Sequence, residues 1–141
     1  MENTIYENFR IIVNHQRNKQ REYLEKFGLY YGQPRVLKMI LDHQNITQSE
    51  LVEKLNVSKE SVSTSLKRLS QNNLVIKTKD ETDKRIIRLS LSDKGRQVTV
   101  DSFKGIQQLN EQLFSSLDEK QRSFLNDIFN QMVQLIEGGN L

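Results

Sequence analysis

Two short helices with matching start signals, followed by alternating apolar and polar residues, constrain the fold of this chain most strongly. In ITQSEL, Thr47 is placed to cap a helix, and Glu50 follows at the spacing of a capping box. In VSKESV, Ser58 can cap a second helix in the same way. The expected helices span about residues 48–55 and 59–71. A connector of about three residues holds such helices against each other, which is typical of a helix-turn-helix.

Two strands are predicted after the second helix. The first begins at residues 74–76. In the second, Ile87, Leu89 and Leu91 alternate with other residues at the period of two that a strand requires. We expect these three side chains to anchor a hairpin to the core. The loop between the strands is predicted at residues 80–84.

Long amphipathic helices are predicted at both ends of the chain. One covers about residues 5–27, a second begins after Ser92, and a third follows a break near residues 116–118. Pro34 suits the first turn of a further helix between the N-terminal helix and Thr47. The terminal helices carry more large apolar residues than a small core can cover, which favours a dimer interface. The alternative is that they fold back over a monomeric core.

The charge of the chain is unevenly distributed. The net charge is only +3, but residues 58–96 contain 10 basic and 5 acidic residues. A basic middle third indicates an anionic partner such as DNA, although a charge run can also be a solvated face. No apolar run reaches the roughly 20 residues of a membrane span, and the polar N-terminus does not resemble a signal peptide. We therefore expect a cytoplasmic protein without membrane contact.

The second helix of the pair has the residues of a DNA-reading helix. Val62, Leu66 and Leu69 form its core face, so its small hydroxyl and basic residues lie on other faces. Such side chains let a backbone approach the major groove closely. An ordinary amphipathic surface helix has the same composition, and only the neighbouring helix and hairpin favour DNA. The residues predicted to face the major groove are Lys59, Ser61, Ser63, Thr64 and Lys67.

The hairpin loop offers a second DNA contact. Asp83 and Arg85 are two residues apart, so on an extended strand they point to one side and can form an ion pair. An Arg oriented in this way suits the minor groove, with Lys84 beside it. Incidental pairing in a solvated turn is the alternative. Asp80 and Glu81 are interpreted as a dispensable tip, because DNA repels carboxylates.

The segment from about residue 33 to residue 95 resembles the MarR family of bacterial transcription regulators. The residues that carry this resemblance are ITQSELVEKLNVSKESVSTSLKRLSQNNLV and DETDKRIIRLSLSDKG, with the Asp-x-Arg element at 83–85 and Leu-Ser-x-x-Gly at 91–95. The chain departs from the family at two positions. Thr64 stands where the family often has Arg, which puts the base preference in question. Asn73 replaces a usual Gly, a mild change because Asn tolerates a positive φ.

The resemblance implies a fold and a function. The fold class is mainly α with a small β-hairpin wing, a winged helix-turn-helix with long N- and C-terminal helices that form a dimerisation region. The domains are expected at 1–32 (N-terminal dimerisation helix), 33–92 (DNA-binding domain) and 93–141 (C-terminal dimerisation helices). The function implied is a ligand-responsive repressor that binds double-stranded DNA at a palindromic, inverted-repeat operator as a homodimer. Arg68 and Lys79 are expected to contact phosphates.

The residues do not indicate an enzyme, a metal site or a cofactor. The chain has no Cys, and His15 and His43 fall on different predicted helices without a ligand-spaced partner. A small-molecule effector pocket is predicted near the first bend, although aromatic residues at such positions more often belong to the core. Its candidate residues are His15, Tyr23, Tyr30 and Tyr31. The alternative function is a winged-helix protein-interaction module without DNA binding.

Overall fold

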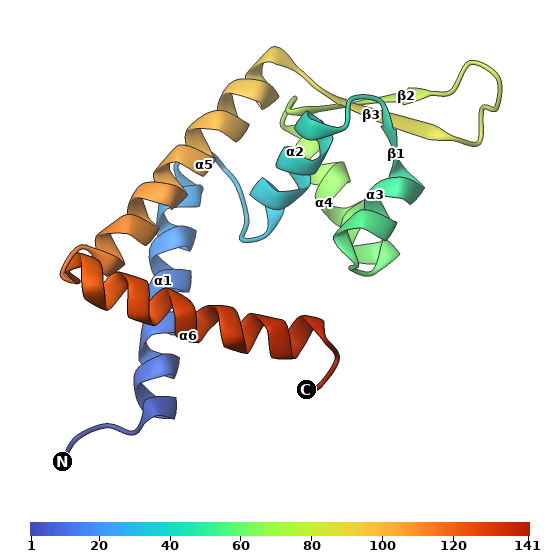
Figure 1. Cartoon of the computed structure of the whole chain (residues 1–141). Helices are drawn as coiled ribbons and strands as arrows, with labels where there is room; N and C mark the ends of the chain where they lie inside the picture. The colour runs from blue at the N-terminus through green and yellow to red at the C-terminus, as the bar shows by residue number, and fades with distance from the viewer. The chain divides into compact units, whose positions relative to one another are not determined.

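The computed structural model describes residues 1–141, which divide into two compact units, residues 1–106 and 107–141. No helix combines the length and the apolar character that crossing a membrane requires. Figure 1 shows the elements in chain order. They are α1 (Ile5–Glu25), α2 (Gln33–Asp42), β1 (Ile46–Thr47), α3 (Gln48–Leu55), α4 (Lys59–Gln71), β2 (Val75–Lys79), β3 (Ile87–Leu91), α5 (Asp93–Phe114) and α6 (Glu119–Glu137).

The helix starts predicted for the central pair are confirmed. The Thr47 hydroxyl accepts from the Glu50 amide at 3.1 Å, and the Glu50 carboxylate accepts from the Thr47 amide at 3.0 Å. The Ser58 hydroxyl accepts from the Ser61 amide at 3.1 Å. Asn56 closes α3 with a φ of 52°. These local bonds satisfy backbone groups that helix ends otherwise leave unpaired. They therefore fix the residues at which α3 and α4 begin.

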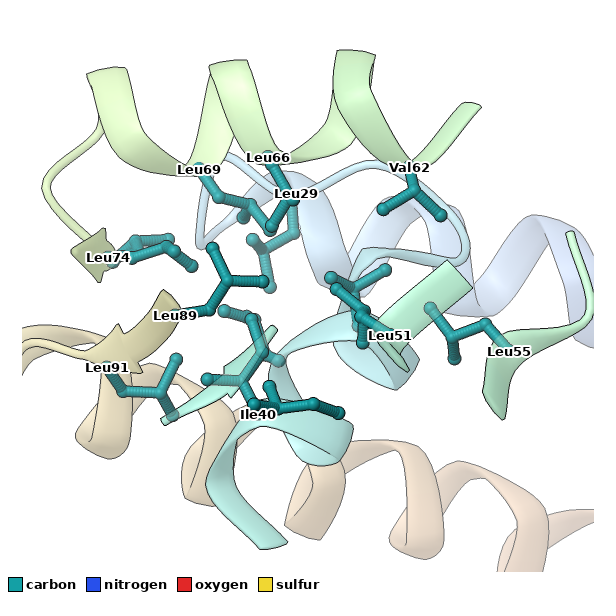
Figure 2. Packing of buried hydrophobic residues seen from close by; sticks show 14 of the residues in the cluster. Leu29, Ile40, Leu51, Leu55, Val62, Leu66, Leu69, Leu74, Leu89 and Leu91 are labelled. Atoms are coloured by element: carbon teal, nitrogen blue, oxygen red, sulfur yellow. The ribbon is translucent and has the colours of Figure 1, made fainter. Parts of the chain in front are cut away.

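The core of the first unit lies between the central helices and the sheet. Leu66 and Leu69 of α4 and Leu89 of β3 are each 0% exposed. Figure 2 shows these side chains pointing toward one another from the α4 ribbon and the strand. Complete burial of a Leu side chain stabilises a fold by about 1.5–3 kcal/mol. The apolar face predicted for α4 is therefore its buried face, and its other faces are free for a partner.

The sheet has three strands rather than the two predicted. Its order is β1-β3-β2, and β1 pairs antiparallel with β3 through Ile46 opposite Leu89 and Thr47 opposite Arg88. Strand β1 has only two residues, too few to show a period of two, and its pairing depends on a strand 40 residues later. β3 is consequently the central strand, hydrogen-bonded on both sides.

The hairpin of β2, the loop 80–86 and β3 forms the wing, which Figure 1 shows extending from the helices. Leu89 and Leu91 are buried as predicted, but Ile87 is 37% exposed. The prediction that Ile87 anchors the wing is wrong, because the strand pair continues beyond the core there. The loop is also longer than predicted, since β3 begins only at Ile87.

Small residues form the most buried positions of α5, and the half-buried Val98 and Ile106 also pack against the core. The buried residues are Gly95, Thr99, Ser102 and Gly105. A Cβ at Gly95 would lie 2.0 Å from the Leu74 carbonyl oxygen, so the backbones approach closely there. The Thr99 hydroxyl donates to the Gly95 carbonyl at 2.7 Å, and the Ser102 hydroxyl donates to the Thr99 carbonyl at 3.1 Å. Both hydroxyls are satisfied within their own helix, so their burial leaves no polar group unpaired.

In the second unit, α6 has a regular start but no core. Asp118 and Gln121 form a capping box, and Gly138 caps the other end of the helix. No residue of α6 is buried, although its sequence is amphipathic. Its exposed apolar side chains are Phe124, Ile128, Phe129, Met132, Val133, Leu135 and Ile136.

Candidate nucleic-acid interface

Helix α4 has a buried apolar face and an exposed polar face, with the half-buried Ser65 and Ser70 between them. Val62, Leu66 and Leu69 are the buried residues. The five residues predicted to face the major groove are all exposed: Lys59, Ser61, Ser63, Thr64 and Lys67. Glu60 is exposed among them and was not predicted as a contact residue. A helix with short hydroxyl side chains and two Lys on its free faces can approach the floor of a major groove.

A groove of about 720 Å³ lies between the start of α3, the start of α4 and the wing. It brings together Lys59 and Arg85, which are 26 positions apart in the sequence. Gln48 and Ser49 of α3 also line it, together with Arg88. The sequence reasoning missed Gln48 and Ser49 as lining residues, and it counted Arg88 only as additional positive charge near the wing. Polar side chains in the first turn of the first helix of the pair were the available signal for Gln48 and Ser49.

The predicted ion pair in the wing is confirmed, but its backbone geometry differs from the prediction. Arg85 donates through Nε to Asp83 Oδ1 at 3.1 Å and through Nη2 to Asp83 Oδ2 at 3.2 Å. The residues lie in a turn closed by the Ile86 amide on the Asp83 carbonyl at 3.0 Å, not on a strand. The Arg85 side chain is 91% exposed. The hydrogen bonds from Arg85 lower the pKa of the Asp83 carboxyl.

Asp80 is an organising residue of the wing, so its interpretation as part of a dispensable tip is wrong. Its side chain is only 12% exposed. It accepts from Arg88 Nε, from the Thr82 hydroxyl at 2.7 Å, and from the Thr82 and Asp83 amides at 3.1 Å each. These bonds, the one from Arg88 first, hold the pKa of the Asp80 carboxyl well below its usual range. Glu81, by contrast, is exposed at the tip of the wing.

The remaining predicted cations are all exposed at the surface, in different settings. Lys79 ends β2, and Lys84 lies in the turn of the wing beside Arg85. The guanidinium carbon of Arg68 lies 4.4 Å from the centroid of the Tyr30 ring. A cation over an aromatic face is attracted by the electrons of the ring, so Tyr30 restricts the directions available to Arg68.

The structure does not gather the predicted effector residues into one place. Tyr30 and Tyr31 line a cavity of about 550 Å³ with Arg21. Tyr23 instead donates its hydroxyl to the Asp101 carbonyl at 3.0 Å and packs edge-on against a neighbouring Phe. His15 is exposed on α1. The structure contains no group of three or more His, Cys, Asp or Glu side chains arranged to hold a metal ion.

This arrangement matches known proteins in sequence and in fold. The sequence model of the MarR family matches residues 29–87. An uncharacterized HTH-type transcriptional regulator of Bacillus cereus is 31% identical over 124 residues, which cover 88% of this chain and 75% of that protein. The HTH-type transcriptional repressor MdtR of Bacillus subtilis is 36% identical over 74 residues, covering 52% of this chain and 48% of MdtR.

A solved structure of the MepR–DNA complex from S. aureus has the same fold, with a TM-score of 0.77 at 23% identity. The alignment covers 94% of this chain and 98% of MepR. The chain spans about half the length of some of the curated regulators that it matches. The match to the B. cereus relative, however, covers 88% of this chain and therefore extends beyond the winged segment. The chain therefore belongs to the MarR family of winged helix-turn-helix transcriptional regulators.

Proposed function

We propose that this regulator binds double-stranded DNA, with α4 in the major groove and the wing in the adjacent minor groove. The observation that carries the proposal is the pairing of the exposed polar face of α4 with a 91% exposed Arg85, both within residues 1–106. The MepR structure with the same fold is a DNA complex, which supports the same kind of partner. Lys59, Ser61 and Ser63 would approach base edges with Thr64 and Lys67.

The wing would supply the minor-groove contact. Asp83 holds the Arg85 guanidinium through two hydrogen bonds, so its direction is set before DNA arrives. Pre-organisation of this kind reduces the entropy that a long side chain loses on binding. Lys84 would add charge beside Arg85, and Lys79 with Arg68 would contact phosphates. Phosphate contacts position the protein, whereas the contacts from α4 select the sequence.

The proposed binding unit is a homodimer. Apolar side chains such as Phe9 and Ile12 of α1 are exposed, and so are Phe129 and Met132 of α6. Exposed apolar surface of this extent on amphipathic helices usually marks an interface. A two-fold axis would place two α4 helices about one turn of DNA apart, roughly 34 Å. The operator would then be an inverted repeat.

We infer repression as the regulatory outcome, since a protein bound over a promoter obstructs transcription. MdtR, which is named a repressor, supports this choice. A small-molecule effector would release the DNA by binding one conformation of the protein more tightly than another. Tyr30 and Tyr31 are the predicted effector residues that share a cavity, and its charged lining residues are one base, Arg21, and one acid, Glu25.

Selection of duplexes from random double-stranded DNA by the full chain tests the function directly. We expect an inverted repeat whose half-sites are about 10 base pairs apart, centre to centre. The measured affinity for this duplex should fall steeply as salt rises. A protein-interaction module would enrich no duplex. Enrichment of single half-sites would retain DNA binding and contradict the dimer.

A further inference from the structure

Arg88 lines the groove beside α3 and its side chain is 39% exposed, yet its guanidinium is hydrogen-bonded to two other groups of the protein. Its Nε donates to Asp80 Oδ1, and its Nη1 donates to the Asn45 carbonyl at 3.0 Å. Asn45 belongs to the loop before β1 and has a φ of 62°. The backbone of Arg88 pairs with Thr47 on one side and Thr78 on the other. Arg88 therefore connects the wing to the loop that leads into the helix-turn-helix.

The two carboxylate oxygens of Asp80 have different partners. Oδ1 accepts from Arg88, whereas Oδ2 accepts from the Thr82 hydroxyl and from the Thr82 and Asp83 amides. Asp83 in turn accepts from the Arg85 backbone amide at 3.0 Å and from its guanidinium. A continuous series of hydrogen bonds thus runs from Asn45 through Arg88, Asp80 and Asp83 to Arg85.

We infer that Arg88 and Asp80 are positioning residues for DNA binding: they orient the tip of the wing so that Arg85 meets the minor groove, without contacting DNA themselves. This inference rests on the proposed function. Charge-assisted hydrogen bonds are about twice as strong as neutral ones, which suits them to fixing a short exposed loop. Without them, the loop would keep its backbone bonds at Ile86 and the bonds between Asp83 and Arg85, none of which involves Thr82. The turn around Thr82 would then sample more conformations.

Replacement of the carboxylate separates this role from simple electrostatics. Asp80→Asn keeps the shape of the side chain and removes one negative charge from the proposed DNA face. Electrostatics alone would tighten binding, because DNA repels carboxylates. We expect the opposite, a loss of about tenfold in affinity for the duplex enriched by the wild-type chain, the size of one good ionic contact. Unchanged or tighter binding would overturn the inference.

Glu81→Gln is the matched control for Asp80→Asn. It removes the same charge from the neighbouring residue, which is exposed and outside the series of hydrogen bonds. We expect its affinity for the same duplex to be unchanged or slightly higher. Thermal unfolding of both variants, followed by circular dichroism, checks that the winged-helix core remains folded. A loss of affinity as large in Glu81→Gln as in Asp80→Asn would also overturn the inference.

A double-mutant comparison tests whether Arg88 acts through the tip of the wing. Arg88→Met should weaken binding of the same duplex by about tenfold in the wild-type chain. In a chain that already carries Lys84→Ala and Arg85→Ala, the same change should cost less than about twofold, because the contacts that Arg88 positions are gone. If Arg88 touches DNA itself, the cost will be equal in both backgrounds, and the inference fails.

Amide hydrogen exchange of the free full chain provides a test without DNA. The Thr82 and Asp83 amides donate hydrogen bonds to the Asp80 carboxylate. They should exchange at least about tenfold faster in Asp80→Asn than in the wild type. Glu81→Gln should leave their exchange unchanged. Equal exchange in Asp80→Asn and wild type would overturn the inference whatever the DNA result. If the wild-type chain enriches no duplex, the proposed function fails, while this exchange measurement still judges the ordering role of Asp80.

Discussion

Helices α4 and α6 are both amphipathic, but the apolar face of α4 is buried and that of α6 is exposed. In α4, Val62, Leu66 and Leu69 are buried against the sheet and the neighbouring helices. In α6, residues such as Phe129 and Met132 remain 42% and 51% exposed, and no residue is buried. An apolar helix face is stable in water only when something covers it. The apolar face of α4 is covered by residues of its own unit. We propose that a second copy of the chain covers the apolar face of α6.

The largest expected effect is loss of the α4 core. Leu66→Ala should lower the free energy of unfolding by about 2–5 kcal/mol, because a fully buried side chain leaves a cavity. Leu135→Ala, on the exposed face of α6, should cost less than about 1 kcal/mol at protein concentrations low enough to prevent association. Denaturant titration at two concentrations measures both. Equal costs at low concentration would contradict the distinction between the two helices.

A charge on the apolar face of α6 should dissociate the proposed dimer. Met132→Asp places an unpaired carboxylate in the proposed interface. We expect the association constant of the dimer to fall by at least about a hundredfold, which corresponds to roughly 3 kcal/mol of binding free energy. Gln134→Asp introduces the same residue on the polar side of the helix and should change it little. Sedimentation velocity at micromolar concentration measures both. A monomeric wild-type chain would instead show that no second copy covers this face.

A smaller effect is expected where α5 packs against the winged-helix core. In Gly95→Ala, the new Cβ would meet the Leu74 carbonyl oxygen at 2.0 Å, so the backbones must separate. We expect a loss of about 1–3 kcal/mol, even though Ala favours helix more than Gly. Lys104→Ala, exposed on the same helix, should stay within about 0.5 kcal/mol. Thermal unfolding that shows Gly95→Ala to be stabilised would indicate that this contact is loose.

Loss of the Arg85 guanidinium from the tip of the wing should weaken DNA binding without changing the free energy of unfolding. Arg85→Ala should weaken binding of the enriched duplex by roughly tenfold and lower the salt slope of log affinity by about one, the loss of one ionic contact. Lys77→Ala, on β2 of the wing, serves as a control for general charge effects. Isotherms over a salt titration measure both variants. A wild-type slope in Arg85→Ala would remove the residue from the interface.

The smallest effect is expected from pH. Hydrogen bonds lower the pKa of Asp80 and of Asp83. Because each pKa is lower in the folded wing, the stabilisation is complete above the usual carboxyl pKa of about 4 and is lost as pH falls through the depressed values. The wing should therefore stay ordered from pH 5 to pH 8. Amide exchange of Thr82 that changes within this range, after correction for the intrinsic rate, would contradict the assignment.

Much of the winged segment could be predicted because its signals are local. The caps at Thr47 and Ser58, the stop at Asn73 and the Asp83–Arg85 pair each depend on residues within three or four positions of one another. Hydrogen bonds over such distances form in almost any context that permits the turn. The period of two likewise located Leu89 and Leu91 correctly in the core.

The errors concern contacts between distant segments. Ile46 pairs with Leu89, and Arg88 joins Asp80 to the Asn45 carbonyl. Both interactions depend on the position of β3 in the sheet. Asp80 resembled a repelled surface acid because its partner Arg88 is eight residues away across the hairpin. The buried small residues of α5 gave no signal of apolar periodicity. Gly and Ser are buried there because their small side chains permit close packing, not because they are apolar.

The sequence by itself determined the order of the helices and of the hairpin, the ends of the central helices, the apolar face of α4 and the family, because these depend on short-range bonding and side-chain periodicity. Only the tertiary structure decided that β1 completes the sheet, that Ile87 lies beyond the core, and that Asp80 organises the wing. Those features depend on chain segments brought together by folding, where the geometry of approach, rather than residue type, selects the partner.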